Sequence, residues 1–131
     1  MKIAGHIAAG LLGLVFLFAG LTVLLKLVPM PPPPPSDTPA GMFHGAFGPT
    51  GYMTFVKVLE VLGGLLVLFP RTRAVGLMVL APILVNIVAF HVFILGGQGL
   101  FSPLLVIAVL AAGFLLWSLR RGLGQLVADR G

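Results

Sequence analysis

The sequence contains no cysteine, which excludes disulfides, thiolate nucleophiles and iron–sulfur or cysteine-ligated zinc sites. It is also poor in charge, since 8% of its 131 residues are charged and three are acidic. A soluble domain carries about 25% charged residues, so this chain lacks the polar surface to cover a globule in water. The hydrophobic content of 59% points instead to an integral membrane protein.

The motifs of the common enzyme classes are missing as well. The chain has no G-x-S-x-G, no Walker A loop and no H-E-x-x-H. Glu60 stands alone in an apolar run and lacks the second carboxylate that a glycosidase needs. The net charge of +5 comes from basic residues dispersed among apolar segments, so we expect no nucleic-acid partner. We therefore expect no catalytic residues, no metal site and no catalytic activity of the chain on its own.

Four apolar runs predict four membrane helices, at about 3–28, 52–69, 74–95 and 100–117, in one membrane domain over residues 1–131. The first run is too long for a signal peptide and lacks an A-x-A-like site, so we read it as a retained helix. Residues 29–51 form a Pro-rich loop. Within it, Pro31 to Pro35 predict a stiff polyproline rod. We expect this rod to be a spacer along the membrane surface rather than a ligand for aromatic grooves.

The distribution of basic residues predicts the orientation of this all-α, four-helix bundle. Four spans place both termini and the loop between the second and third helices on one side. That side carries Lys2, Arg71, Arg73, Arg120, Arg121 and Arg130, against Lys26 near the other. The positive-inside rule puts the N and C termini in the cytoplasm. We expect a multi-pass protein of the bacterial inner membrane, with the Pro-rich loop between helices one and two outside.

Polar residues within the apolar runs predict a site in the outer half of the bundle. Lys57, Glu60 and Gly64 share one helical stripe. A charge near the bilayer centre costs roughly 2.5–3.5 kcal/mol, so such a stripe is expected to face protein. Counting at about 1.5 Å per residue places the polar candidates roughly 14–27 Å from the cytoplasmic ends. These candidates are Glu60, Lys57, Asn86, Thr22 and His91. An alternative is purely structural: a local ion pair, and an interhelical hydrogen bond from Asn86.

Histidines are the candidate cofactor ligands. Three roles are predicted for His91: binding a quinone carbonyl, ligating a porphyrin metal, or bonding to a backbone carbonyl or lipid headgroup. A haem or chlorophyll-type pigment would need a second ligand at similar depth, for which His44 in the outer loop is the candidate. His6 lies near the opposite face. Of these cofactors, we expect a quinone to be compatible with these histidines, and we regard a haem or chlorophyll-type pigment as disfavoured.

Small residues predict where the helices approach one another. Gly5, Ala9 and Gly13 recur every four residues, and Gly64 extends the Lys57–Glu60 stripe. Such residues permit close helix packing in membranes. The alternative is a chance distribution, because glycine is common in membrane helices.

Several of these segments together resemble the DoxX-like membrane proteins. The resemblance covers about residues 7 to 121. It is carried by Leu12 to Leu21, by Pro29-Met30-Pro31-Pro32, by Gly51-Tyr52 leading to Lys57-Val58-Leu59-Glu60-Val61-Leu62-Gly63-Gly64, and by Ala81 to Phe93. The family commonly has a lysine after Gly-Leu-Asn near the end of helix one. Here Thr22 and Val23 follow Gly20-Leu21, and the lysine, Lys26, comes one turn later.

The resemblance implies a compact four-helix membrane bundle and a link to quinone or oxidative-stress chemistry. The family takes its name from small subunits associated with thiosulfate:quinone oxidoreduction. Glu60, Asn86 and His91 match its pattern. Three functions remain open: a non-catalytic accessory subunit of a larger respiratory or photosynthetic redox complex, a quinone-interacting subunit, or a small oligomeric transporter or channel. The expected partners are lipid and either other membrane subunits or further copies of the chain.

Overall fold

The computed structural model describes residues 3–29 and 31–121, and within these ranges the chain is helical without any strand. Met30 and the terminal basic residues Lys2 and Arg130 lie outside the described residues. In chain order the elements are α1 (Ile3–Leu24), α2 (Pro39–Phe47), the 3₁₀ turn η1 (Gly48–Thr50), α3 (Tyr52–Leu68), α4 (Arg73–Ala89), the π-helical turn η2 (Phe90–Ile94) and α5 (Pro103–Ser118). The all-α class predicted from the sequence is confirmed.

Two of the described helices are long and apolar enough to cross a membrane. α1, and α4 together with η2, each run for 22 residues at a mean hydropathy of 2.5. A third span results if α2 with η1 and α3 count as one broken element, although they meet at 83°. α5 is apolar but has only 16 residues. These helices indicate a membrane protein.

α1 ends at Leu24 rather than near Val28, because a Schellman cap closes it. The N–H of Leu27 donates to the Thr22 carbonyl at 3.0 Å, and the N–H of Lys26 donates to the Val23 carbonyl at 3.2 Å. This pattern requires a left-handed residue after the helix, which is usually glycine. Here Lys26 adopts it, with φ of 53°.

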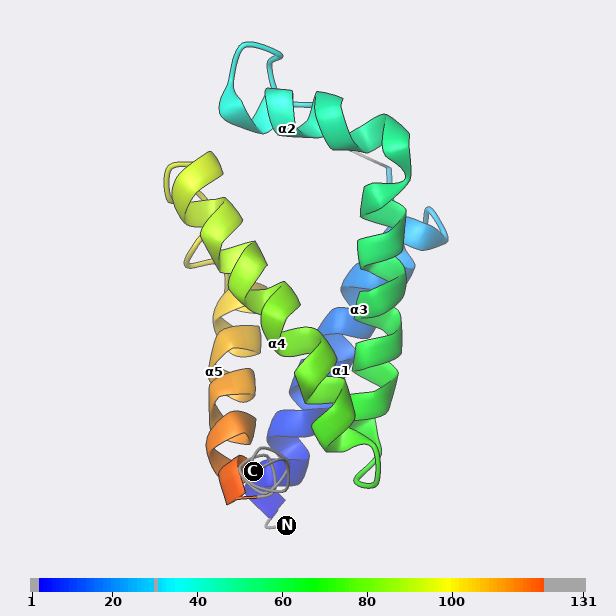
Figure 1. Ribbon diagram of the computed structural model, residues 1–131, viewed down its shortest axis with the longest axis vertical. Helices are drawn as coiled ribbons and strands as arrows, with labels where there is room; N and C mark the ends of the chain where they lie inside the picture. Colours follow the sequence, from blue (N-terminus) through cyan, green and yellow to red (C-terminus); the bar gives the residue numbers. More distant parts are fainter. Residues whose placement is uncertain (1–2, 30, 122–131) are drawn as a thin grey trace, which may run out of the picture.

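The segment expected to be an irregular loop contains a helix, α2. Thr38 caps it, since its Oγ1 accepts from the N–H of Gly41 at 3.1 Å, and Pro39 occupies the first helical turn. Threonine followed by proline is a helix start signal that the prediction of a structureless 29–51 segment overlooked. α2 lies across the end of the molecule, above α3 and α4 (Figure 1).

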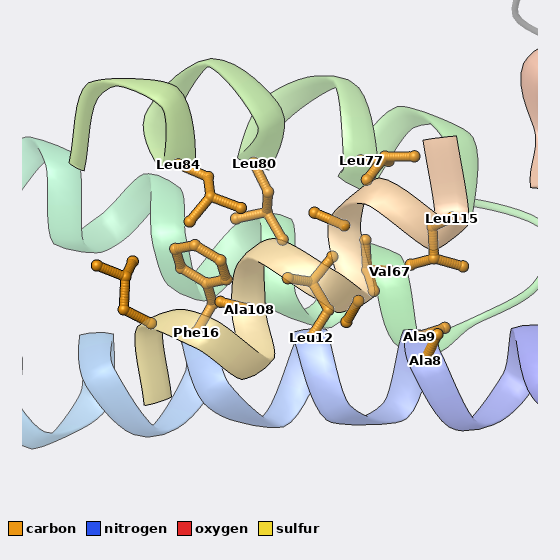
Figure 2. Packing of buried hydrophobic residues seen from close by; sticks show 13 residues of the cluster. Ala8, Ala9, Leu12, Phe16, Val67, Leu77, Leu80, Leu84, Ala108 and Leu115 are labelled. Carbon is orange, nitrogen blue, oxygen red and sulfur yellow. The ribbon is translucent and has the colours of Figure 1, made fainter. Parts of the chain in front are cut away.

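The hydrophobic core lies away from α2. α1 packs against α3 and α5, and α3 packs against α4. Figure 2 shows their side chains meeting between the helices, with Leu12 and Phe16 of α1 facing Leu80 and Leu84 of α4. Toward α2, by contrast, α3 and α4 diverge (Figure 1). Packing is therefore tight at the end where α1 begins and looser at the end that α2 covers.

Glycines set the closest approaches between helices. A Cβ added to Gly13 of α1 would lie 2.8 Å from the Gly64 carbonyl oxygen of α3, and one added to Gly64 would lie 2.9 Å from the Gly13 oxygen. Gly5 and Ala9, on the same face of α1, are buried too. The small residues singled out in the sequence thus lie where α1 meets its neighbours.

Candidate functional site

A cavity of about 630 Å³ lies beneath α2, between α3 and the π-helical turn η2. We call it the outer cavity. Most of its wall is apolar, with Phe43 of α2, Met53 of α3 and Phe90 of η2 among its residues. Its side chains with polar ends are His44 and Lys57. The cavity therefore combines an apolar wall with an imidazole and an ammonium group, which suits a lipid-soluble molecule with a polar head.

The Lys57–Glu60 pair predicted from the i, i+3 spacing forms beside this cavity. The Lys57 Nζ lies 3.0 Å from Glu60 Oε2. Glu60 is only 2% exposed, whereas the Lys57 side chain keeps 21% of its surface. The two atoms are within ion-pair distance, but they are not oriented as a hydrogen bond. Among the described residues, no donor forms a hydrogen bond to Oε2. Glu60 is thus a buried carboxylate with an incomplete set of partners.

The close approach of α1 to α3 at Gly20 helps to bury this pair. A Cβ at Gly20 would lie 3.0 Å from the Lys57 carbonyl oxygen and 2.6 Å from a Val61 methyl group. The backbone of α1 therefore presses against the turn of α3 that carries Lys57. Such close packing helps to keep water from the Glu60 carboxylate, and Lys57 is the charged group that the structure places beside it.

Asn86 is the predicted site residue that the structure places elsewhere. We expected it to face protein, but it is exposed. The buried face of α4 is formed by Leu77, Leu80 and Leu84. Because Asn86 follows Leu84 by two residues, it points about 200° round the helix, away from the core. It therefore does not join Lys57 and Glu60 in one interior site.

The remaining predicted residues are placed separately. Thr22 is half-buried, and its carbonyl accepts the capping bond from Leu27. His91 is half-buried, and its Nδ1 lies 2.8 Å from the Ile87 carbonyl oxygen of its own helix. Nδ1 therefore carries the proton, and the backbone bond is the one of its three predicted roles that the structure displays. His44 lines the outer cavity, whereas His91 does not. No group of three potential metal ligands occurs among the described residues.

A second polar cluster, which sequence reasoning missed, lies at the opposite end of the bundle. Arg73, at the start of α4, is 4% exposed. Its Nε donates to the Val67 carbonyl at 2.8 Å and its Nη2 donates to the Leu68 carbonyl at 3.0 Å, so it caps the C-terminus of α3. Its Nη1 lies 3.2 Å from Nδ1 of His6 on α1. One guanidinium thus ties three helices together.

Comparisons with known proteins give one relative and no functional description. No protein-family model matches the chain, and no solved structure matches it. A Bacillus subtilis (strain 168) protein with the name "Uncharacterized protein YwoB" is 39% identical over 71 residues, which are 53% of this chain and 44% of the relative. This chain is therefore similar to that Bacillus protein over about half of its own residues, and it spans less than half of the relative's length.

Proposed function

We propose that α1, α3, α4 with η2, and α5 each cross a bacterial inner membrane as a four-helix bundle. The start of α1, the α3–α4 loop and the end of α5 lie at one end of the molecule (Figure 1). Arg71, Arg73 and Arg120 belong to that end, which supports a cytoplasmic location for both chain ends. Tyr52 at the outer start of α3 and Trp117 at the inner end of α5 are both exposed, as aromatic residues at the two membrane interfaces are.

We further propose that the protein is a DoxX-like, non-catalytic accessory subunit of a larger respiratory or photosynthetic redox complex. The observation that carries this proposal is the pair of grooves beside α5. One groove, of about 400 Å³, runs between α1 and α5 and includes Ala8 and Ala111. The other, of about 310 Å³, runs between α4 and α5 and includes Ala112 and Gly113. Small residues along a groove allow another membrane helix to approach closely, which supports a subunit contact here.

A quinone-interacting subunit is the alternative, and the outer cavity favours it. A quinone ring fits between apolar and aromatic walls, and its carbonyl oxygens would accept hydrogen bonds from Lys57 or His44. Electrons would come from a partner that carries its own redox cofactor. A transporter or channel finds no comparable support in the described residues, and we do not propose it.

Gentle detergent extraction from native membranes, followed by mass spectrometry of the intact assembly and its extracted small molecules, tests both functions. The accessory role predicts larger subunits bound to this chain, and Gly113→Leu should release them by filling the α4–α5 groove. Phe93→Leu is the matched control, because Phe93 is 80% exposed and lies on η2, away from both grooves.

Two outcomes decide between the proposals. A chain that runs alone or as a homo-oligomer, with quinone bound and lost in Lys57→Met, would overturn the accessory role and support the alternative. Larger subunits that stay bound in Gly113→Leu would show that the α4–α5 groove is not the subunit contact.

A further inference from the structure

The polar side chains that line the outer cavity are positively charged or neutral. Lys57 contributes an ammonium group and His44 an imidazole, and no acidic side chain of the described residues lines the cavity. Glu60 lies behind Lys57 and is almost fully buried. A molecule that enters the cavity therefore meets a cation first, with an apolar wall around it.

Helix α3 adds to the positive potential of this cavity. α3 begins at Tyr52, and Met53 in its first turn lines the cavity together with Lys57 one turn further on. The N-terminal end of a helix carries a partial positive charge. Helix and side chain therefore favour the same kind of head group, a negatively charged one.

The ion pair with Glu60 leaves Lys57 able to change partner. Nζ and Oε2 are 3.0 Å apart but are not aligned as a hydrogen bond, and the Lys57 side chain is 21% exposed. Lysine has a long flexible stem, so its ammonium can turn from Oε2 toward the cavity. Glu60 cannot follow it, because that carboxylate is enclosed between helices.

We propose that the outer cavity binds a singly charged anionic amphiphile, with its head on Lys57 and its apolar chain against Phe43, Met53 and Phe90. The anionic head pairs with the Lys57 ammonium at the mouth of the Glu60 site, and the apolar wall takes the chain out of water. This inference goes beyond the subunit role and does not rest on it.

Other basic side chains have to be separated from Lys57 in the test. Those on the elements around α3 are His6 on α1, Lys26 after it, His44 on α2, Arg73 on α4 and His91 on η2. His6 pairs with Arg73 at the far end of the bundle, and His91 bonds to its own helix. His44 lines the same cavity, so it needs its own variant.

Binding of a fluorescent single-chain alkyl sulfonate to the full chain in nanodiscs of zwitterionic lipid tests this proposal. The neutral alcohol analogue of the same chain length is the matched probe. The sulfonate should bind at least tenfold more tightly than the alcohol. Lys57→Met should lose at least tenfold in affinity for the sulfonate, whereas His44→Gln should lose less than Lys57→Met.

Each other result overturns the proposal. Unchanged affinity for the sulfonate in Lys57→Met contradicts it. Binding of the neutral alcohol analogue, or of a neutral quinone analogue, as tight as that of the sulfonate indicates a different ligand class. The comparison of sulfonate with alcohol uses the unmodified protein, so the test does not depend on variants that fail to fold.

The lipid of the nanodisc identifies the source of the head group. Addition of an anionic phospholipid that competes with the sulfonate would make a resident membrane lipid the natural occupant. Absence of competition would make it a free single-chain amphiphile.

Discussion

Gly76→Ala should destabilise the bundle by about 2 kcal/mol, because α4 contacts the backbone of α3 at this residue. An added Cβ would lie 2.6 Å from the Val67 nitrogen and 2.9 Å from both the Gly63 oxygen and the Leu66 carbonyl carbon. Since all three atoms belong to backbone, no rotamer change relieves the overlap and α4 has to move away. Overpacking costs about 1–3 kcal/mol, and this site belongs near 3. Alanine returns about 1 kcal/mol through its higher helix propensity.

Gly113→Ala is the matched control. It makes the same chemical change within an apolar helix, but a Cβ at Gly113 has no heavy atom within 4 Å. We expect a gain of up to about 1 kcal/mol there. Denaturant unfolding of the protein in detergent micelles, followed by far-ultraviolet circular dichroism, gives both free energies of unfolding. Equal effects of the two substitutions would show that the α3–α4 contact is not as tight as the structure has it.

Three further substitutions test individual contacts by the same unfolding measurement. Lys26→Gly should gain about 1 kcal/mol, because glycine adopts the left-handed conformation of the α1 cap without strain; no gain would contradict the capped geometry. Lys57→Met should cost about 2 kcal/mol, less than a fully buried pair because Lys57 is partly exposed, and adding Glu60→Met should restore most of the loss. A double variant as unstable as the single one would rule out an unpaired carboxylate as the cause. Arg73→Lys should cost about 2 kcal/mol, because an ammonium cannot reproduce the contacts of the guanidinium with two carbonyls and His6. The control Arg71→Lys, at an exposed position, should cost nothing measurable. Equal effects of the two substitutions would show that Arg73 contributes through its charge alone.

Local spacing predicted the features that depend on one helix. Lys57 and Glu60 are three residues apart, and helical geometry alone brings their charges together. Small residues four apart on α1 likewise predicted a packing face, and Gly13 lies in it. These relations need no knowledge of how the helices are arranged.

The direction of a side chain on an apolar helix was not predictable in this way. α4 is hydrophobic all round, so the sequence does not mark which face is buried. We placed Asn86 inside on the assumption that a polar residue avoids lipid, and the wrong assignment follows from that assumption. Arg73 was missed for the opposite reason. Its neighbours suggested an exposed basic loop, while its burial depends on the carbonyls at the end of α3, which only the fold brings near.

The shortness of α5 has a consequence for the surrounding bilayer. Its 16 residues extend about 24 Å, less than the roughly 30 Å of a hydrocarbon core, whereas the 22 residues of α1 extend about 33 Å. In the four-helix bundle that we propose, both helices cross the membrane, so lipid would have to thin beside α5 and not beside α1. Neighbouring proteins that thin the bilayer in the same way would share that elastic cost when they sit beside α5. This difference in bilayer thickness would therefore favour neighbours with short membrane helices on the α5 side, independently of side-chain contacts.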